Sequence, residues 1–503
     1  MLPLLIVVPL IGLIVLNLNS GRMARRWSER FVFLLAVLQV LLVLIPHGAF
    51  LKFLQANYSG GWATLVLDRY SAFLKSDFLH TYFAFNLEAT NLSRVLLLSI
   101  GIVMFVTAHV ARTAISDEIQ RRNFFNILLV ALIGMNGAVL VKDVFSLYVF
   151  LEVTSVSSFI AIAFNRDKNA LEGAFKYLIF STVATIMMLS AVSLLLLLAG
   201  GTSFETVGQA LAPSGGNVLV KVAMGVFVCG LFIKGGLMPF HGWLPDAYSA
   251  APAPVSVLLA GVATKASGIY AMIRLVTDVF PASAAIGEVL LLIGAISIVG
   301  GALAALGQIN LKRLLSYSSV SQVGYIILAL GCASSNDPVV AKLGLAGAVF
   351  HLFNHSIFKS LLFVNSAALE QRLGTTDMNK MGGLGAKMPL SSLTSVIAAL
   401  STAGVPPFSG FWSKLIIVIA LWKGNHYVYA AIAVMFSVVT LGYLLTMQRK
   451  IFFGKCDSNA GDIREAGYDL AMPAVALAAV TTALGVLIPY VWNTFLLPIS
   501  SIF

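Results

Sequence analysis

Single charged residues interrupt long apolar stretches of this 503-residue sequence, in positions where a charge is costly to bury. Glu152 lies within LYVFLEVTSVSSF, Lys234 within FVCGLFIKGGLMPF and Lys265 within LLAGVATKASGIY. Lys414 lies within PPFSGFWSKLIIV, where it could also extend its charge to the surface along its apolar stem. Ionisable residues in such stretches indicate a pathway for ions or protons.

A series of titratable side chains follows in a later apolar stretch. His351, His355 and Lys359 are spaced four residues apart, so they share one face of a helix. His351 taken alone could be a packing histidine, but one shared function explains the whole series better. Histidine exchanges protons near neutral pH and can relay them in both directions.

Four further titratable residues allow other interpretations. Lys176 lies near a helix start and could be an anchor at the surface or a relay. His241 lies in PFHGWLPDAYS, where it could relay protons or only bond backbone groups freed by a helix break. Arg274 and Lys342 lie near the ends of apolar segments, and we interpret them as anchors.

The residue types are those that proton transfer requires. A buried lysine has lost its hydration, so it can gain and lose a proton near neutral pH. A nearby carboxylate favours the charged form, so a movement of Glu152 toward or away from Lys234 would switch proton binding. Prolines beside these residues free backbone carbonyls and leave room for water between the titratable groups.

The elements that position these residues are predicted to be membrane-spanning helices. The sequence is 59% hydrophobic and 11% charged, whereas soluble globular proteins carry about 25% charged residues. Apolar runs of about 20 residues recur, and in a bilayer such runs must be helices because every backbone amide needs a local partner. We therefore predict an all-α polytopic membrane protein of about 14 transmembrane helices. The predicted spans are 2–18, 31–46, 93–111, 124–141, 144–164, 175–200, 218–237, 252–277, 286–307, 315–333, 342–367, 389–421, 427–447 and 470–496.

Helices seven and twelve are predicted to be broken, at Pro239 and at Pro406–Pro407. FKYLIF and FKSLLF begin at Phe175 and Phe358, and PFHGW and PFSGFW follow them in the same order. These pairs indicate that helices four to eight recur as helices nine to thirteen, and the odd helix number inverts the second copy. The predicted parts are N-terminal helices with an outer loop (1–123), a first five-helix repeat (124–280), an inverted second repeat (281–450) and a C-terminal helix (451–503).

The distribution of Lys and Arg predicts the orientation of the chain. The two sets of alternate loops carry 18 and 7 of these residues, and the richer set is expected on the cytoplasmic side. With an even number of helices, both termini then lie outside a prokaryotic inner membrane. The net charge of +11 is spread over short loops without a basic stripe, which argues against a nucleic-acid partner.

Two further patterns concern the first apolar segment and the cysteines. The segment 2–18 is expected to be a retained first helix, because no cationic stretch precedes it and no small-residue cleavage site follows it. Cys229, Cys332 and Cys456 form no CxxC pair, so we predict neither a zinc site nor an iron–sulfur cluster.

The stretch that contains Lys234 and Lys265 resembles one family of membrane proteins. IKGGLMPFHGWLPDAY and PAPVSVLLAGVATKASGIY are similar to antiporter-like subunits shared by respiratory complex I, membrane-bound NiFe hydrogenases and multisubunit Na+/H+ antiporters of the Mrp type. The resemblance covers nearly the whole chain, most closely residues 120–450. The residues that match the family's titratable positions are Glu152, Lys234, Lys265, His351, His355, Lys359 and Lys414.

The resemblance implies 14 core helices in two inverted five-helix repeats, each forming a half-channel. It implies no quinone, flavin or cluster in this chain, and it implies other membrane subunits as partners, among them other antiporter-like subunits. The sequence ends at Phe503, so we expect it to lack the long lateral helix of the largest complex I member. Position 414 is Lys, where one complex I member has Glu.

Three hypotheses for the function result. The leading one is a subunit that translocates protons, or exchanges Na+ for H+, within a redox complex such as a membrane-bound hydrogenase or NADH dehydrogenase. The alternative is a component similar to the Mrp D protein of a stand-alone Mrp-type antiporter without a redox partner. A scaffold with a vestigial channel is disfavoured by the intact series of titratable residues from Glu152 to Lys414.

Overall fold

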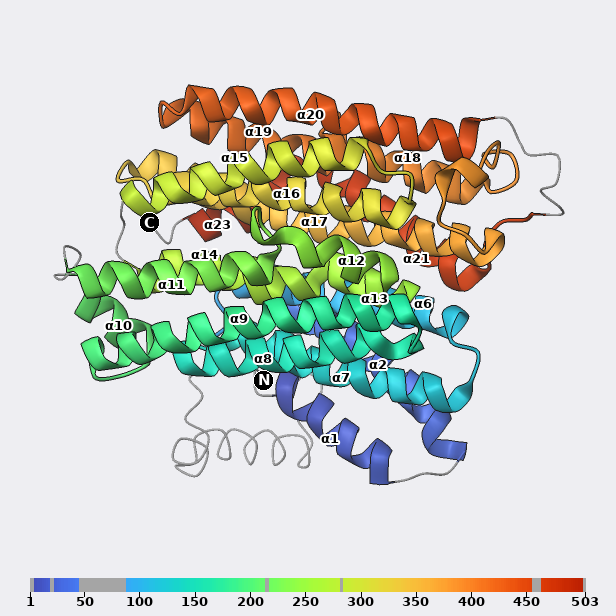
Figure 1. Ribbon diagram of the computed structural model, residues 1–503, viewed down its shortest axis with the longest axis horizontal. Helices are drawn as coiled ribbons and strands as arrows, with labels where there is room; N and C mark the ends of the chain where they lie inside the picture. Colours follow the sequence, from blue (N-terminus) through green and yellow to red (C-terminus); the bar gives the residue numbers. More distant parts are fainter. Residues whose placement is uncertain are drawn as a thin grey trace, which may run out of the picture.

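The computed structural model describes residues 4–18, 22–44, 87–212, 217–280, 284–454 and 463–500. Within these ranges the chain is helical apart from loops and three isolated β-bridges. Eleven of the described helices are long and apolar enough to cross a membrane, and they lie side by side along the long axis of the molecule (Figure 1). The all-α membrane fold is therefore confirmed, while the count of 14 stays a prediction. The predicted outer loop before residue 87 and Cys456 lie outside the described residues.

Several of the N-terminal helices begin where a polar side chain caps them. These helices are α1 (Leu4–Leu18), α2 (Arg22–Leu44), α6 (Asn91–Ala114), α7 (Glu118–Leu140), α8 (Val144–Ile162), α9 (Lys168–Ala199) and the short α10 (Phe204–Leu211). Asp117, Asp143 and Asp167 each accept a hydrogen bond from the backbone N–H three residues on, at the starts of α7, α8 and α9. Such caps satisfy N–H groups that a helix start leaves without partners.

Both helices that the sequence predicts to be broken are interrupted in the structure. The first break separates α11 (Val218–Gly235) from α12 (Trp243–Ala250), and the second separates α18 (Pro389–Ala403) from α19 (Ser409–Lys423). Each first half ends at a glycine with left-handed backbone, Gly236 (φ 67°) and Gly404 (φ 87°), three residues before Pro239 and Pro407. Glycine adopts this conformation without a steric penalty, and proline cannot continue the hydrogen-bond ladder, so the two breaks are built alike.

The eighth predicted helix is largely π-helical, which the sequence did not predict. It consists of α13 (Ala253–Leu258), η3 (Leu259–Ala263), η4 (Lys265–Tyr270), α14 (Ala271–Arg274) and η5 (Leu275–Val279). In a π-helix the hydrogen bonds join residues five apart, so the winding is looser and carbonyls are displaced from α-helical positions. Lys265 begins the second π-helical segment, in the fully buried part of this helix.

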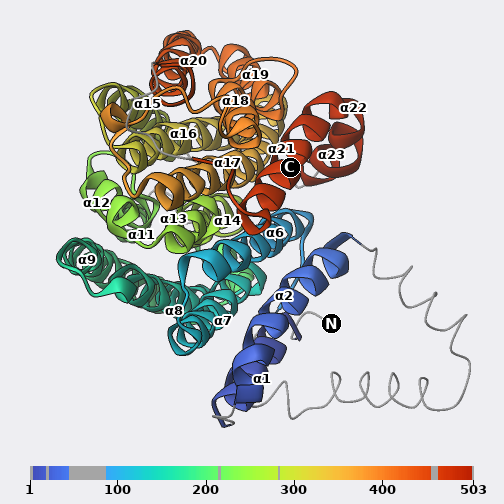
Figure 2. The ribbon, with the colours of Figure 1, turned by 90° about the vertical axis from the view of Figure 1, so that its right-hand side faces the viewer.

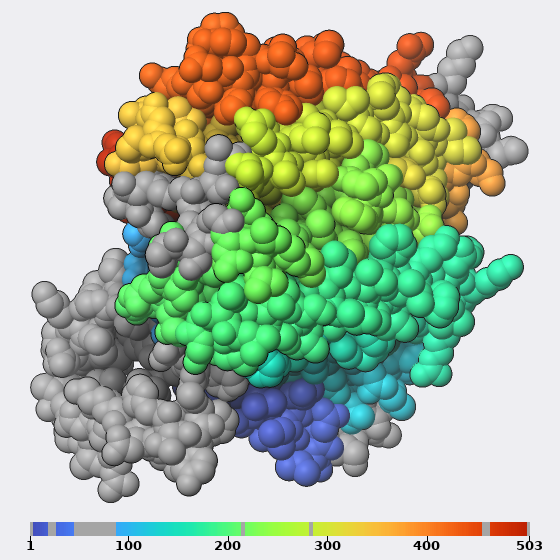
Figure 3. Space-filling model, turned by 60° about the vertical axis from the view of Figure 1, so that its left-hand side comes forward, coloured from blue at the N-terminus to red at the C-terminus, as the bar shows by residue number. Residues whose placement is uncertain are grey.

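The C-terminal part of the chain contains one long, largely buried helix, α17 (Pro338–Leu373). The other long helices of this part are α15 (Ala284–Leu306), α16 (Leu311–Ala333), α20 (Tyr427–Gln448) and α21 (Tyr468–Val486). Viewed along the helices, α17 is enclosed by α6, α13, α16, α18 and α21 (Figure 2). From outside, α9 and α11 form one part of the surface and α15 and α20 another (Figure 3), whereas most residues of α17 are buried.

The prediction of a single helix over 470–496 is wrong. The helix α21 ends at Val486, and α22 (Ile488–Val491), η8 (Trp492–Leu496) and α23 (Leu497–Ser500) follow it as short turns. Pro489 provides the reason, because its nitrogen cannot donate and its ring would clash with the carbonyl of Gly485. These turns therefore do not extend α21, and η8 and α23 pack against α17 (Figure 2).

The two FK motifs of the predicted repeat lie at different positions along their helices. Lys176 is near the start of α9, whereas Lys359 lies past the middle of α17. The two proline breaks correspond closely, but these motifs do not. The inverted repeat and the boundaries of the predicted parts therefore stay predictions.

A close approach of two backbones joins α11 to the π-helical segment η4. A Cβ atom on Gly268 would lie 2.4 Å from the nitrogen and 2.5 Å from the Cα of Gly235. We expect Gly268→Ala to force the two elements apart and destabilise the protein by about 1–3 kcal/mol, the usual cost of overpacking. Gly225→Ala on the exposed side of α11 is the matched control, because its Cβ would meet no atom within 4 Å.

The melting temperatures of the detergent-solubilised variants measure this difference. Gly268→Ala should melt below the wild type and Gly225→Ala should not. Equal melting temperatures for the two variants would show that the Gly235–Gly268 contact is not a close-packed joint.

Candidate functional site

Lys234 is buried where α8, α9 and α11 meet. Its Nζ donates to Glu152 Oε1 (2.7 Å), Ser155 Oγ (2.6 Å) and Ser181 Oγ (2.8 Å), and the side chain is 1% exposed. All three donors of the ammonium are thus used, as a buried charge requires. Thr185 Oγ1 donates to the same carboxylate oxygen of Glu152 (2.5 Å). The predicted pairing of Glu152 with Lys234 is present in the structure.

Glu152 itself is not fully buried. Its side chain is 27% exposed, and it lies on a face of α8 whose other members are exposed apolar residues. Those members, at helical spacing on either side of Glu152, are Phe145, Val149, Val156 and Ile160. The carboxylate of the pair can therefore be reached from outside this chain, whereas the ammonium cannot.

Lys176 belongs to a different charge cluster. Its Nζ lies 2.7 Å from Glu172 Oε1 and 2.7 Å from Asp246 Oδ2, and Arg313 Nη1 donates to Asp246 Oδ1 (2.5 Å). Lys176 is 39% exposed and makes no side-chain contact with Lys234 among the described residues. Asp246 bridges α9 and α16 here, and sequence analysis did not single it out.

His241 lies in the first break, within the short 3-10 turn Phe240–Gly242 (η2). Its ring packs at 6.1 Å, centroid to centroid, against the ring of Tyr317 of α16. Its Nδ1 is buried and has no hydrogen-bond partner among the described residues. The structure thus places His241 in the predicted break, with an aromatic ring as its neighbour instead of a lysine.

Lys265 is buried without a carboxylate in contact among the residues that the structure describes. Its Nζ donates to Thr264 Oγ1 (3.1 Å) and lies 5.8 Å from the centre of the Tyr248 ring. A Cβ on Gly261, one turn earlier, would lie 2.3 Å from Ser360 Oγ, so this helix is in close contact with α17. The contact places Lys265 beside the central helix.

Lys359 lies inside α17 and bonds α16. Its Nζ donates to Ser318 Oγ (2.7 Å) and to the carbonyl of Leu315 (3.3 Å), and Tyr443 Oη donates to the same serine (2.8 Å). The residue is completely buried. Its partners are a hydroxyl and a carbonyl, so within the described part of the chain no negative charge in direct contact compensates the ammonium.

His355 and His351 continue from Lys359 along α17, at four-residue steps of about 6 Å. His351 Nδ1 is 2.9 Å from Ser413 Oγ, and its Nε2 has no partner among the described residues. Neither ring nitrogen of His355 has one there either. Buried polar atoms without protein partners are normally satisfied by water, so this part of α17 is suited to a hydrated path.

Lys414 lies at the second break. Its Nζ is 3.4 Å from the carbonyl of Ala403, the last residue of α18, and 4.3 Å from the centre of the Tyr325 ring. The carbonyl end of a helix and the face of an aromatic ring both attract cations. The residue is 5% exposed, so the alternative of a charge extended to the surface is not seen. We call Lys234, Lys265, Lys359, His355, His351 and Lys414 the titratable row.

Gln322 is a member of this site that sequence analysis missed. It is completely buried on α16, and neither its Nε2 nor its Oε1 has a partner among the described residues. It shares a helix face with Ser318, which bonds Lys359, and with Tyr325, whose ring centre lies 5.8 Å from that of His351. Gln322 therefore faces the histidines. Polar residues that recur every three or four positions in an apolar span could have indicated it from the sequence.

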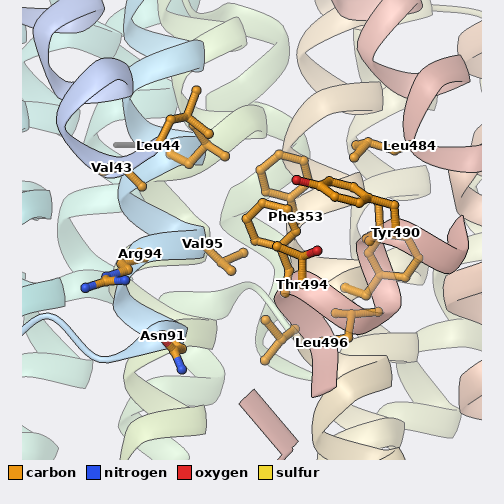
Figure 4. A pocket seen from close by; sticks show the side chains of 15 residues that line it. Val43, Leu44, Asn91, Arg94, Val95, Phe353, Leu484, Tyr490, Thr494 and Leu496 are labelled. Atoms are coloured by element: carbon orange, nitrogen blue, oxygen red, sulfur yellow. The ribbon is translucent and has the colours of Figure 1, made fainter. Parts of the chain in front are cut away.

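An apolar pocket lies elsewhere in the described part of the chain. It has a volume of about 400 Å³ and is bounded by α2, α6, α17 and the turns after α21 (Figure 4). Its lining includes Val95, Phe353 and Tyr490 and no member of the titratable row. Among the described residues no group of three His, Cys, Asp or Glu could hold a metal ion.

A family model described as "NADH:quinone oxidoreductase/Mrp antiporter, TM" matches residues 141–440, a range that includes the whole titratable row. This chain belongs to that family. The resemblance inferred from the two motifs around Lys234 and Lys265 is thereby confirmed.

The chain is similar to curated proteins of two kinds. It is 32% identical over 404 residues to the D subunit of the Na(+)/H(+) antiporter of Alkalihalophilus pseudofirmus, a match that covers 80% of each chain. It is 36% identical over 327 residues to the N subunit of the NADH-quinone oxidoreductase of Desulforudis audaxviator, covering 64% of each.

Solved structures agree over nearly the whole chain. A chain of the Mrp complex from a Dietzia species superposes with a TM-score of 0.83 at 25% identity, covering 100% of this chain and 96% of that one. A chain of a membrane-bound sulfane sulfur reductase, an archaeal respiratory membrane complex, does so with a TM-score of 0.83 at 28% identity, covering 100% and 97%.

Coupling between Glu152 and Lys234 can be measured by a double-mutant cycle on transport rate and melting temperature. Since the two side chains are in contact, we expect Glu152→Gln with Lys234→Ala to transport no worse than Lys234→Ala alone. Either single change should cost up to roughly 3–5 kcal/mol, because it leaves the charge of the partner uncompensated, and the double change should cost less.

The control cycle combines Lys234→Ala with Glu205→Gln, which changes an exposed carboxylate on α10. Effects on stability in that cycle should add. Fully additive losses in the Glu152 cycle as well would mean that the pair does not act as a unit.

Proposed function

We propose that this chain translocates protons as a subunit of a multisubunit membrane complex related to complex I. The observation that carries the proposal is the titratable row itself, buried from α11 through η4 and α17 to α19. Protons fit these groups better than Na+, because an ammonium offers only donors and Na+ requires oxygen ligands. The partners would be other membrane subunits, including further antiporter-like subunits, as in the named complexes of its relatives.

The first step takes place at the exposed carboxylate. A neighbouring subunit that contacts the apolar face of α8 can attract or release Glu152 without entering the bundle. When Glu152 moves away, the charge on Lys234 loses its compensation and becomes costly to keep. Lys234 then gives up its proton toward the interior of the bundle.

Repulsion between like charges moves protons along the rest of the row. Lys265, Lys359 and Lys414 have no carboxylate in direct contact among the described residues. In a low-dielectric interior, charges in such positions repel strongly, so the row cannot hold a proton on every amine. A proton arriving at Lys265 therefore favours release from the far end of the row.

His355, His351 and the side chain of Gln322 provide the connection in this scheme. The imidazoles pass protons in both directions, while the amide of Gln322 can hold water between them through its donor and acceptor. Lys414, at the second helix break, is the last group and exchanges its proton with one side of the membrane. No electron passes through this chain in the scheme.

Two kinds of complex are compatible with this role. A redox complex, such as a hydrogenase or NADH dehydrogenase, is supported by the relatives in respiratory complexes. A stand-alone Na+/H+ antiporter is supported by the match to the D subunit of such an antiporter over 80% of both chains. Purification of the complex separates them: subunits with NiFe or iron–sulfur ligand motifs indicate the redox complex, and small membrane subunits alone indicate the antiporter.

Replacement of Lys234 tests the proposed function directly. We expect Lys234→Ala to abolish proton translocation by the reconstituted complex while the complex still assembles, because alanine removes a charge that is costly to bury. Lys221→Ala, an exposed lysine on the same helix, is the matched control and should pump normally. Normal pumping by an assembled Lys234→Ala complex would refute the role of the row.

The uneven distribution of Lys and Arg leads us to propose that both termini face the outside of the cell. The expected result is labelling of a cysteine added at either end by a membrane-impermeant maleimide in intact cells. The background would lack Cys229, Cys332 and Cys456. Lys168→Cys, exposed at the start of α9, is the opposite-side control and should react only after permeabilisation. Protection of both termini in intact cells would show that the orientation is the opposite of the proposed one.

A further inference from the structure

The helix that carries Lys265 ends in a buried arginine. Arg274 lies in α14, and its side chain is 1% exposed, so the interpretation of this residue as a surface anchor is wrong. Its Nε donates to Asp278 Oδ2 (2.5 Å), and the centre of the Phe204 ring lies 5.1 Å from its Cζ. Its Nη2 is buried without a hydrogen-bond partner among the described residues.

Arg274 belongs to a polar cluster that joins four helical segments. Its Nη1 donates to Tyr270 Oη (3.1 Å) and to the carbonyl of Val139 (3.5 Å), near the C-terminal end of α7. Tyr270 Oη also bonds Ser93 of α6 (2.9 Å) and donates to the carbonyl of Val139 (2.9 Å). With Phe204 of α10, the cluster closes the space between this helix and α6, α7 and α10.

Both ends of this helix border a hollow. Ala253, at its start, borders a polar hollow of about 640 Å³, which is also lined by Asp167, Lys312 and Glu370. At the other end Asp278 borders a hollow of about 440 Å³, and Arg274 lies on the inner side of this carboxylate. In Figure 1, α13 and α14 mark these opposite ends.

We propose that Arg274 is a fixed positive barrier that closes this end of the Lys265 helix to protons, so that they leave only along α17. The inference rests on the proposed function and adds a residue that determines the direction of proton transfer. Protons on Lys265 lie on the order of 10 Å from the guanidinium along the helix. The guanidinium lies on the inner side of Asp278, so a hydronium or Na+ that arrives from Lys265 meets its positive charge first and is repelled in this low-dielectric space.

Arginine suits a barrier for reasons that do not apply to the lysines of the row. Its guanidinium keeps its proton in proteins, so it repels cations but does not relay a proton. The partial negative charge at the end of α7 and the carboxylate of Asp278 compensate it, so it can stay charged while buried. The ring of Phe204 holds the flat guanidinium in place.

The experiment measures passive proton leak through the purified complex in liposomes. A potassium diffusion potential drives protons inward, a trapped pH-sensitive dye reports them, and the driving reaction is left off. We expect Arg274→Gln to raise the leak about tenfold or more above the wild type, because the Coulomb barrier is gone. Arg274→Lys, which keeps a positive charge, should leak much less than Arg274→Gln.

Two further variants separate a barrier from general damage. Arg94→Gln makes the same change at an exposed arginine one residue from Ser93 and should not leak. The double variant Arg274→Gln with Lys265→Leu should lose most of the added leak, since the leak is expected to run through Lys265. A leak caused by loosened packing would not depend on that lysine.

The proposal is overturned if assembled Arg274→Gln stays as tight as the wild type, or if its leak persists in the double variant. Failure of the wild-type complex to pump protons would refute the proposed function instead. The two failures are thus distinguishable in the same set of liposomes. A leak that requires Lys265 and is suppressed by Arg274→Lys supports the barrier.

Discussion

A lysine ammonium that leaves water must find oxygen atoms to bond or give up its proton, and this requirement organises the interior of the bundle. A regular helix offers it few free carbonyls, because each is already bonded within the helix. The helices are interrupted beside three of the buried lysines, and Lys414 bonds a carbonyl that a break leaves free. Lys234 precedes the first break, Lys265 lies in π-helical backbone and Lys414 bonds the end of α18.

The charges are distributed unevenly between the edge and the centre of the molecule. Lys234 shares its charge with Glu152, which faces outward among apolar side chains, whereas the lysines nearer α17 have neutral groups as their described contacts. In our proposal, a change outside the chain acts on this one carboxylate, and the inner amines respond although no outside group touches them. The polar closure around Arg274 makes this arrangement directional in our proposal.

The sequence reveals the chemistry of this site better than its geometry. Single ionisable residues are conspicuous in the middle of apolar runs, and prolines identify both breaks, so Lys234, Lys265 and Lys414 could be predicted. Ser155 and Gln322 could not be assigned in that way, because serine and glutamine are tolerated in many helices and only packing shows which one meets a lysine. The π-helical winding around Lys265 and the burial of Arg274 likewise depend on neighbouring helices, and a local sequence pattern contains no information about those neighbours. The end of α21 could have been predicted, because Pro489 is visible in the sequence.

Hydroxyl groups are the partners that Lys234, Lys265 and Lys359 have in common, and a hydroxyl can both accept and donate. It accepts a hydrogen bond from the ammonium and, after rotating, donates one to the neutral amine. Each lysine therefore keeps a bonded neighbour whether it is loaded or empty. The folded state need not loosen when its cargo leaves, so the integrity of the bundle is independent of the stage of its transport cycle.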